Sequence, residues 1–161
     1  MILNMDIWGG DEQMPTRFNL MKVNEEAFNV LMTMDQVAKR STIEQGLLEL
    51  IKIRASQING CAFCIDLHTK DARRLGETER RIYALNAWRG SGFFTEREMV
   101  VLAFTEAMTL IHENQISDDL YTELEKHFTE KEISTLVLAI VSINSFNRAM
   151  IAARAFPAQE E

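Results

Sequence analysis

Two cysteines and a histidine within NGCAFCIDLH, residues 59–68, have the types and spacing of a thiol active site. Cys61 and Cys64 are the two cysteines of the chain, and His68 follows four residues after Cys64. On one α-helix, separations of three and four residues bring side chains onto a common face. There His68 can accept the proton of Cys64, or stabilise its thiolate as a cation. The pattern predicts a redox-active dithiol on a helix.

The position of Cys61 in the first turn of that helix favours an anion. Backbone N–H groups at a helix start lack partners within the helix and point toward such a group. This setting can lower the pKa of a cysteine from ~8.5 to between ~3.5 and ~7.5. We therefore expect one of the two sulfurs to ionise readily.

Glu49 is the fourth candidate residue, and it comes from the preceding helix. If the two helices pair antiparallel about Asn59-Gly60, Glu49 lies ten residues before the turn and His68 nine after it. At 1.5 Å per residue both are ~13–15 Å from the turn, so the carboxylate is level with the imidazole and can orient it. An alternative is a surface pair of Glu49 with Lys52 on a polar stripe.

Other interpretations of the cysteines stay open. Both can be small buried apolar side chains, since cysteine is often buried. A zinc site of Cys61, Cys64, His68 and Glu49 is geometrically possible, although structural zinc sites usually draw ligand pairs from separate elements. The combined pattern favours the redox interpretation over both, so we expect no bound metal and no cofactor.

Composition and charge restrict the class of protein. The chain has 161 residues, 47% of them hydrophobic, and a net charge of −7, which indicates one domain and argues against nucleic acid or an anionic membrane as partner. The first 14 residues are too acidic for a signal peptide, and the longest apolar run, Leu136 to Ile143, is below the ~18 residues of a membrane span. We expect a cytoplasmic protein, where close cysteine pairs are more often catalytic, redox-sensing or metal-binding than structural.

The elements that must position these residues are predicted to be helical. Seven glycines and two prolines are few for a chain with many β-turns. Capping boxes are expected at Thr42/Gln45, Thr95/Glu98 and Thr129/Glu132. The expected helices span about 24–40, 43–59, 61–75, 78–88, 95–111, 117–127 and 129–154. We predict an all-α, single-domain bundle of six to seven helices, with residues 1–22 as an N-terminal arm and 23–161 as the helical domain. A faint repeat of Ile58-Asn59 at Ile143-Asn144 lacks cysteines in its second copy.

The order Glu49, Cys61, Cys64, His68 resembles the signature of the AhpD-like alkylhydroperoxidase group within the carboxymuconolactone decarboxylase family. The surrounding sequence LLELIKIRASQINGCAFCIDLHTKDARRLGETERR, and then YALNAWR and FTEREMVVLAFTEAMT, extend the resemblance over about residues 43–111. It implies an all-helical fold assembled as a homo-oligomer, a trimer or hexamer, and reduction of a hydroperoxide substrate by thiols.

By this resemblance, Cys64 is the peroxidatic thiol that becomes sulfenic acid, and Cys61 is the proton donor and resolving thiol that closes a disulfide with it. His68 and Glu49 are the proton relay, and a thiol or dithiol of unknown identity is the electron donor. The best-studied branch has a histidine at the position of Phe63, so an alternative is a thiol–disulfide oxidoreductase or redox sensor with little peroxidase turnover. The decarboxylase branch typically lacks the cysteine pair, which argues against a lactone decarboxylase.

Overall fold

The computed structural model describes residues 15–113 and 115–157, and within them all regular structure is helical. The predicted all-α architecture is confirmed. Most of the expected N-terminal arm, residues 1–14, lies outside the described residues, so the predicted division of the chain stays a prediction. The helices are α1 (Leu20–Val23), α2 (Glu25–Lys39), α3 (Gln45–Asn59), α4 (Ala62–Arg74), α5 (Glu79–Ala84), α6 (Trp88–Ser91), α7 (Glu96–Thr109), α8 (Asp118–Glu125) and α9 (Glu130–Ala153), with a 3₁₀ helix at Leu85–Ala87.

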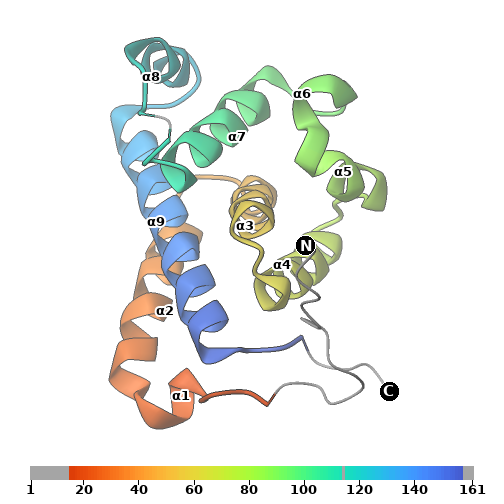
Figure 1. Cartoon of the computed structure of the whole chain (residues 1–161). Coiled ribbons are helices and arrows are strands. Elements are labelled where there is room, and N and C mark those ends of the chain that lie inside the picture. Colours follow the sequence, from red (N-terminus) through yellow and green to blue (C-terminus); the bar gives the residue numbers. More distant parts are fainter. Residues whose placement is uncertain (1–14, 114, 158–161) are drawn as a thin grey trace, which may run out of the picture.

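Helix α3 lies at the centre of the bundle and packs against α4, α7 and α9 (Figure 1). The long α9 runs beside it and also packs along α2, so residues far apart in sequence meet around α3. A group of buried side chains joins α3 and α9 at the start of α4, and it contains both cysteines. The fold therefore brings α2, α3, α4 and α9 together around the thiol pair.

The turn between α3 and α4 has the predicted form. Gly60 ends α3 in the left-handed conformation, with φ of 70°, which glycine adopts without steric cost. The backbone N–H of Cys61 donates to the carbonyl of Ser56 at 3.0 Å, and Cys61 is the N-cap of α4. Because this turn is tight, α3 and α4 are held as an antiparallel pair.

Of the three predicted capping boxes, those that begin α7 and α9 are present, and the one predicted at Thr42 is wrong. Helix α3 begins at Gln45, and its N-cap residue makes no side-chain capping bond. The Thr42 hydroxyl instead donates to Glu132 on α9 at 3.3 Å, and the Gln45 amide donates to the carbonyl of Lys39 at 2.7 Å. The two side chains are therefore engaged with α9 and α2, and α3 begins without a side-chain cap.

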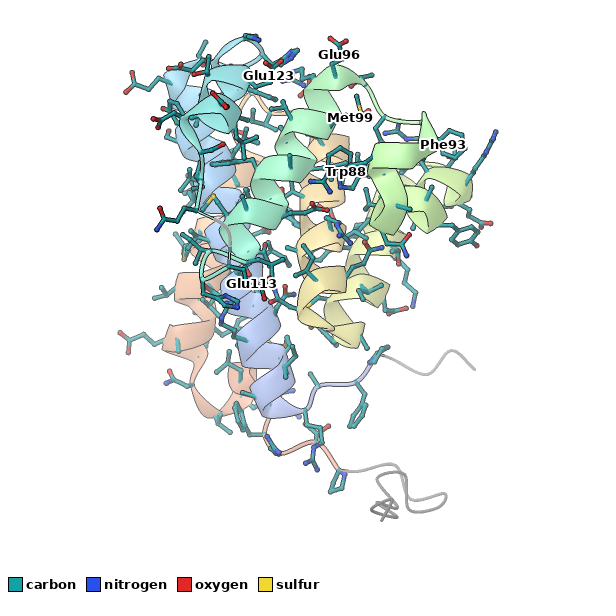
Figure 2. The ribbon with its side chains drawn as sticks, turned by 45° about the horizontal axis from the view of Figure 1, so that its top comes forward. Trp88, Phe93, Glu96, Met99, Glu113 and Glu123 are labelled. Atoms are coloured by element: carbon teal, nitrogen blue, oxygen red, sulfur yellow. The ribbon has the colours of Figure 1, made fainter. Side chains whose placement is uncertain are left out.

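The helix expected over residues 78–88 is interrupted, which is one reason why the structure has more helices than the six or seven predicted. A 3₁₀ helix separates α5 from α6, and α6 ends at Ser91, followed by Gly92 with a φ of 69°. The Trp88 indole N–H donates to the Glu106 carboxylate of α7 at 2.8 Å. Figure 2 shows Trp88 and Phe93 on the side of α7 away from Glu123 of α8. The bond between Trp88 and Glu106 fixes where α6 packs, and the chain bends before α6.

By length and composition α9 is able to cross a membrane, with a mean hydropathy of 1.6. The core helix of a water-soluble protein passes the same test. Here α9 packs against α2, α3, α4, α7 and α8, and its apolar residues enter two of the buried clusters. We therefore describe α9 as a core helix, and the absence of a membrane partner stays a prediction.

Candidate active site

The two cysteines lie at the start of α4 and are almost fully buried. Cys61 is 1% and Cys64 2% exposed, both as free thiols. They pack with Ala55 of α3 and with Ile143 and Met150 of α9. The predicted placement of the pair on one helix is present, with Cys61 at the N-cap rather than inside the first turn.

The two thiols interact strongly, so they ionise one at a time. A hydrogen bond from the Cys64 thiol lowers the pKa of Cys61 to about 7, although burial opposes this, and the Cys64 backbone N–H and the Asn147 amide add to the effect. The hydrogen bond with Cys61 and burial raise the pKa of Cys64. A first negative charge therefore forms readily on Cys61, whereas a second one beside it is strongly disfavoured.

The contact predicted between Glu49 and His68 is present. The Glu49 Oε2 atom lies 2.8 Å from Nδ1 of His68, and both side chains are buried. Their positions opposite one another follow from the tight α3–α4 turn. Because Nδ1 faces the carboxylate, it carries the proton and leaves Nε2 as the ring nitrogen that can take up another.

Lys52 is buried rather than on the surface, which corrects the alternative of an exposed Glu49–Lys52 pair. Its side chain is 2% exposed, and Nζ lies 2.9 Å from Glu49 Oε1 and 2.8 Å from Asp35 Oδ1 of α2. Asp35 also pairs with Lys39 at 2.9 Å. Although burial raises their pKa values, hydrogen bonds and cationic charge hold the carboxyl groups of Asp35 and Glu49 below their usual pKa range. The site thus contains a row of groups with alternating charge that ends at His68. This charge row consists of Lys39, Asp35, Lys52, Glu49 and His68.

Asn147 of α9 is a further site residue that the sequence analysis did not single out. It is fully buried; its amide donates to the Ser56 hydroxyl at 2.9 Å and accepts from the Asn59 amide at 2.9 Å. Asn147 also acts on the thiols, because its side chain lowers the pKa of both Cys61 and Cys64. Asn59 also donates to Asn144 at 3.0 Å, so the two asparagines of the faint sequence repeat meet in the structure.

A pocket of about 200 Å³ opens at this site, and Cys64 is the cysteine that lines it. His68 lines it as well, with Asp35, Lys39 and Lys52 at its polar side. Its apolar walls are formed by Phe28, Met32, Phe63, Leu67, Ile143, Phe146 and Met150. Phe63 therefore lies at the pocket wall. The pocket gives a small apolar molecule access to a wall that Cys64 and His68 both line.

A metal ion fits this site poorly. Among the described residues, ligand atoms of Glu49, His68 and Asp71 lie within 4.8 Å of one another. This set lacks the two cysteines of the zinc alternative. One Glu49 oxygen already contacts the Lys52 ammonium, and the other contacts the His68 ring. The Lys52 cation, 2.9 Å from a candidate ligand oxygen, would repel a divalent ion. The arrangement instead suits movement of a proton between a thiol and an imidazole.

Comparisons with known proteins agree with this fold. The sequence profile of the carboxymuconolactone decarboxylase family matches residues 25–107. The chain is 45% identical to the uncharacterised protein YdfG of Bacillus subtilis over 139 residues, which cover 86% of this chain and 95% of YdfG.

Two solved structures illustrate the range of similar proteins. A protein of unknown function from Agrobacterium tumefaciens, described as a candidate antioxidant defence protein AhpD, superposes with a TM-score of 0.88 at 38% identity over 91% of this chain and 100% of its own. The debrominase Bmp8, in complex with 2,3,4-tribromopyrrole, shares the fold with a TM-score of 0.74 at 20% identity over 88% of this chain and 74% of its own.

Proposed function

The chain belongs to the carboxymuconolactone decarboxylase family and has an AhpD-like fold, and from this premise we propose that it is a thiol-dependent peroxidase that reduces organic hydroperoxides. The observation that carries the proposal is the apolar pocket in which the Cys64 thiol and the Glu49-bound His68 imidazole both stand at the wall. A sulfur nucleophile beside an oriented base is what attack on a peroxide oxygen requires.

In the first step Cys64 attacks the terminal oxygen of the hydroperoxide. The proton of Cys64 passes to Nε2 of His68, the S–O bond forms and the O–O bond breaks. The departing alkoxide takes the proton from His68 and leaves as an alcohol. Cys64 becomes a sulfenic acid, so the sulfur loses two electrons and the peroxide gains them. Glu49 stabilises the imidazolium that exists between the two proton transfers.

In the second step Cys61 resolves the sulfenic acid. Cys61 is the sulfur that ionises first in the reduced pair, with a pKa of about 7, and as a thiolate it attacks the Cys64 sulfur. The S–S bond forms and the S–O bond of the sulfenic acid breaks, and the hydroxide leaves as water with a proton from the solvent, which received the proton of Cys61 when that thiol ionised. An external dithiol then reduces the disulfide and returns both thiols. We propose that this donor acts in a reducing compartment such as the cytoplasm, on a homo-oligomer of this chain.

The chemistry of the pocket suits a neutral organic substrate. Its walls are mainly aromatic and aliphatic, and its volume of about 200 Å³ is adequate for a small aromatic or branched alkyl group. The two lysines at its polar side are already paired with Asp35 and Glu49, so neither offers a free charge to an anionic substrate. The Agrobacterium relative, with its antioxidant description, is consistent with this activity, whereas Bmp8 acts on a brominated ring.

The test is multiple-turnover consumption of cumene hydroperoxide by the reduced protein with dithiothreitol as donor. We expect Cys64→Ser to abolish turnover, and unchanged turnover in this variant would end the proposal. Cys61→Ser is the matched control: it should undergo one oxidation, detectable as a sulfenic acid at Cys64 by mass mapping, without forming a disulfide. A wild-type protein that consumes only one equivalent of peroxide would indicate a redox sensor instead of an enzyme.

A further inference from the structure

We propose that Asp35 and Lys52 are positioning residues that fix the Glu49 carboxylate and set the electrostatic balance of the thiol site. The inference extends the proposed peroxidase function to two residues for which neither the motif nor the family resemblance assigns a role. The inference rests on the geometry of the charge row between α2 and α4. Its test measures ionisation of the thiols and therefore needs no peroxide.

Lys52 controls the orientation of Glu49. The two carboxylate oxygens have different partners: Oε1 lies 2.9 Å from Lys52 Nζ, and Oε2 lies 2.8 Å from His68 Nδ1. With one oxygen held by the ammonium, the carboxylate can rotate little about its last torsion, so the other oxygen stays directed at the imidazole. A lysine that is 2% exposed is stable only when it is paired. The pairing therefore also prevents the cation from turning toward solvent.

Asp35 completes the pairing of Lys52 from a different helix. Its two carboxylate oxygens lie 2.8 Å from Lys52 Nζ and 2.9 Å from Lys39 Nζ. Asp35, Lys39 and Lys52 all line the pocket that Cys64 and His68 line. Changes of charge in this group therefore act on Cys64 across a partly desolvated space, where electrostatic interactions are stronger than in water, and Cys64 is hydrogen-bonded to Cys61.

The titratable and charged groups around the thiols come from three helices: Asp35 and Lys39 from α2, Glu49 and Lys52 from α3, and Cys61, Cys64, His68 and Asp71 from α4. The residues that α9 contributes to the pocket wall are not titratable. Loss of the Lys52 cation makes this group more negative and disfavours a thiolate. Loss of the Asp35 anion makes it more positive and favours a thiolate. The two substitutions therefore have opposite signs.

The experiment measures thiolate absorbance in the ultraviolet against pH for the reduced full-length protein, with the Cys61→Ser/Cys64→Ser double variant as background. We expect Lys52→Met to raise the midpoint and Asp35→Asn to lower it. In the double variant Asp35→Asn/Lys52→Met the charge of the group equals that of the wild type, so the midpoint should return toward the wild-type value.

A purely structural role for these residues gives a different result. Shifts of the same sign in both single variants, or a double variant that does not return, would overturn the inference. Arg54→Met and Glu106→Gln remove a comparable ion pair between α3 and α7, with an Nε–Oε1 distance of 2.8 Å, and should leave the midpoint unchanged. If Lys52→Met does not fold, Lys39→Met is the second variant: its side chain is 40% exposed, so a smaller upward shift is expected.

The outcome is separable from that of the proposed function. If the midpoints move as expected but the wild type consumes no peroxide, the peroxidase proposal fails and the assignment of Asp35 and Lys52 stands. If the wild type turns over peroxide and the midpoints of all variants coincide, the assignment alone is wrong. For active protein, the acidic limb of the pH profile of kcat/KM should move in the same directions as the thiolate midpoint.

Discussion

Glu49→Gln tests whether the carboxylate behind His68 contributes to turnover through its charge. The change preserves the size of a side chain that is 3% exposed. A carboxylate offers an oxygen to each of Lys52 and His68, whereas an amide has one oxygen and one NH₂ group. We expect the buried ammonium of Lys52 to keep the oxygen, because an ammonium only donates hydrogen bonds and would repel an amide NH₂ group facing it. The NH₂ group then faces Nδ1 of His68, and the bond of 2.8 Å is lost.

The size of the effect follows from the kind of bond that is removed. A hydrogen bond to a charged group contributes about 1.5–3 kcal/mol. If the bond is made fully to the imidazolium formed during proton transfer, this corresponds to a loss of about 10- to 150-fold in kcat/KM at ~1.36 kcal/mol per tenfold. We expect the loss mainly in kcat, because the apolar walls that bind the substrate are unchanged.

The assay is steady-state consumption of cumene hydroperoxide with dithiothreitol, with circular dichroism to verify the fold. Glu106→Gln is the matched control, because Glu106 accepts bonds from Trp88, Arg54 and Arg89 on the other side of α3. We expect this control to lower stability and to leave kcat/KM within about twofold of the wild type, below the loss from one charged hydrogen bond. A folded Glu49→Gln protein with wild-type kcat/KM would refute the relay and leave His68 as an unassisted base.

Three further predictions concern the thiols, the buried charges and the pocket. Asn147→Leu removes an amide that lowers the pKa of both thiols, so the thiolate midpoint should rise, and an unchanged ultraviolet titration would contradict this role. The folded-state pKa values of Asp35 and Glu49 lie below their ordinary values of 3.8 and 4.5. The stability that these carboxylates contribute is therefore present above the ordinary values and lost as the pH falls through the folded-state pKa. Chemical denaturation from about pH 5 down to pH 2 should show a weaker pH dependence for Asp35→Asn than for the wild type. Cumene hydroperoxide should have a higher kcat/KM than a hydroperoxide of similar size that carries a carboxylate, and the reverse order would contradict the apolar pocket lined by Phe63.

The contact between Glu49 and His68 was predictable because it depends on local rules. Asn59-Gly60 marks a sharp turn in the sequence, and residues counted from that turn along two rigid helices reach the same level. The same counting placed Cys61 at the start of a helix, with an error of one position. Where a single turn connects two elements, spacing in the sequence translates directly into distance in space.

Asp35 and Asn147 escaped prediction because their contacts depend on packing between distant helices. Asp35 lies 17 residues before Lys52, on a helix that packs mainly against α9, and no local spacing indicates that the two meet. Lys52 had a misleading local signal, since a pair at i and i+3 with Glu49 is typical of an exposed helix face. Its burial depends on α2 covering that face and bringing a second carboxylate. The sequence pointed to α9 only through Asn144 in the faint repeat. The Asn59 amide that donates to Asn144 also donates to Asn147.

The geometry separates two properties that a thiol peroxidase requires. Cys61, at the N-cap of α4, has the lower pKa, whereas Cys64 lines the pocket. The sulfur that a substrate can reach is therefore the one that keeps its proton at rest, which protects it from indiscriminate oxidation. Reaction at Cys64 requires its proton to move, and His68 is the base that lines the same pocket. Charge already present on Cys61 repels a second thiolate at rest, but it becomes useful once Cys64 is a neutral sulfenic acid, because Cys61 is then ready to attack. The order of the two proposed steps thus follows from the difference between the N-cap and the interior of α4, and in our proposal the charge row from Asp35 to His68 determines how easily the first step begins.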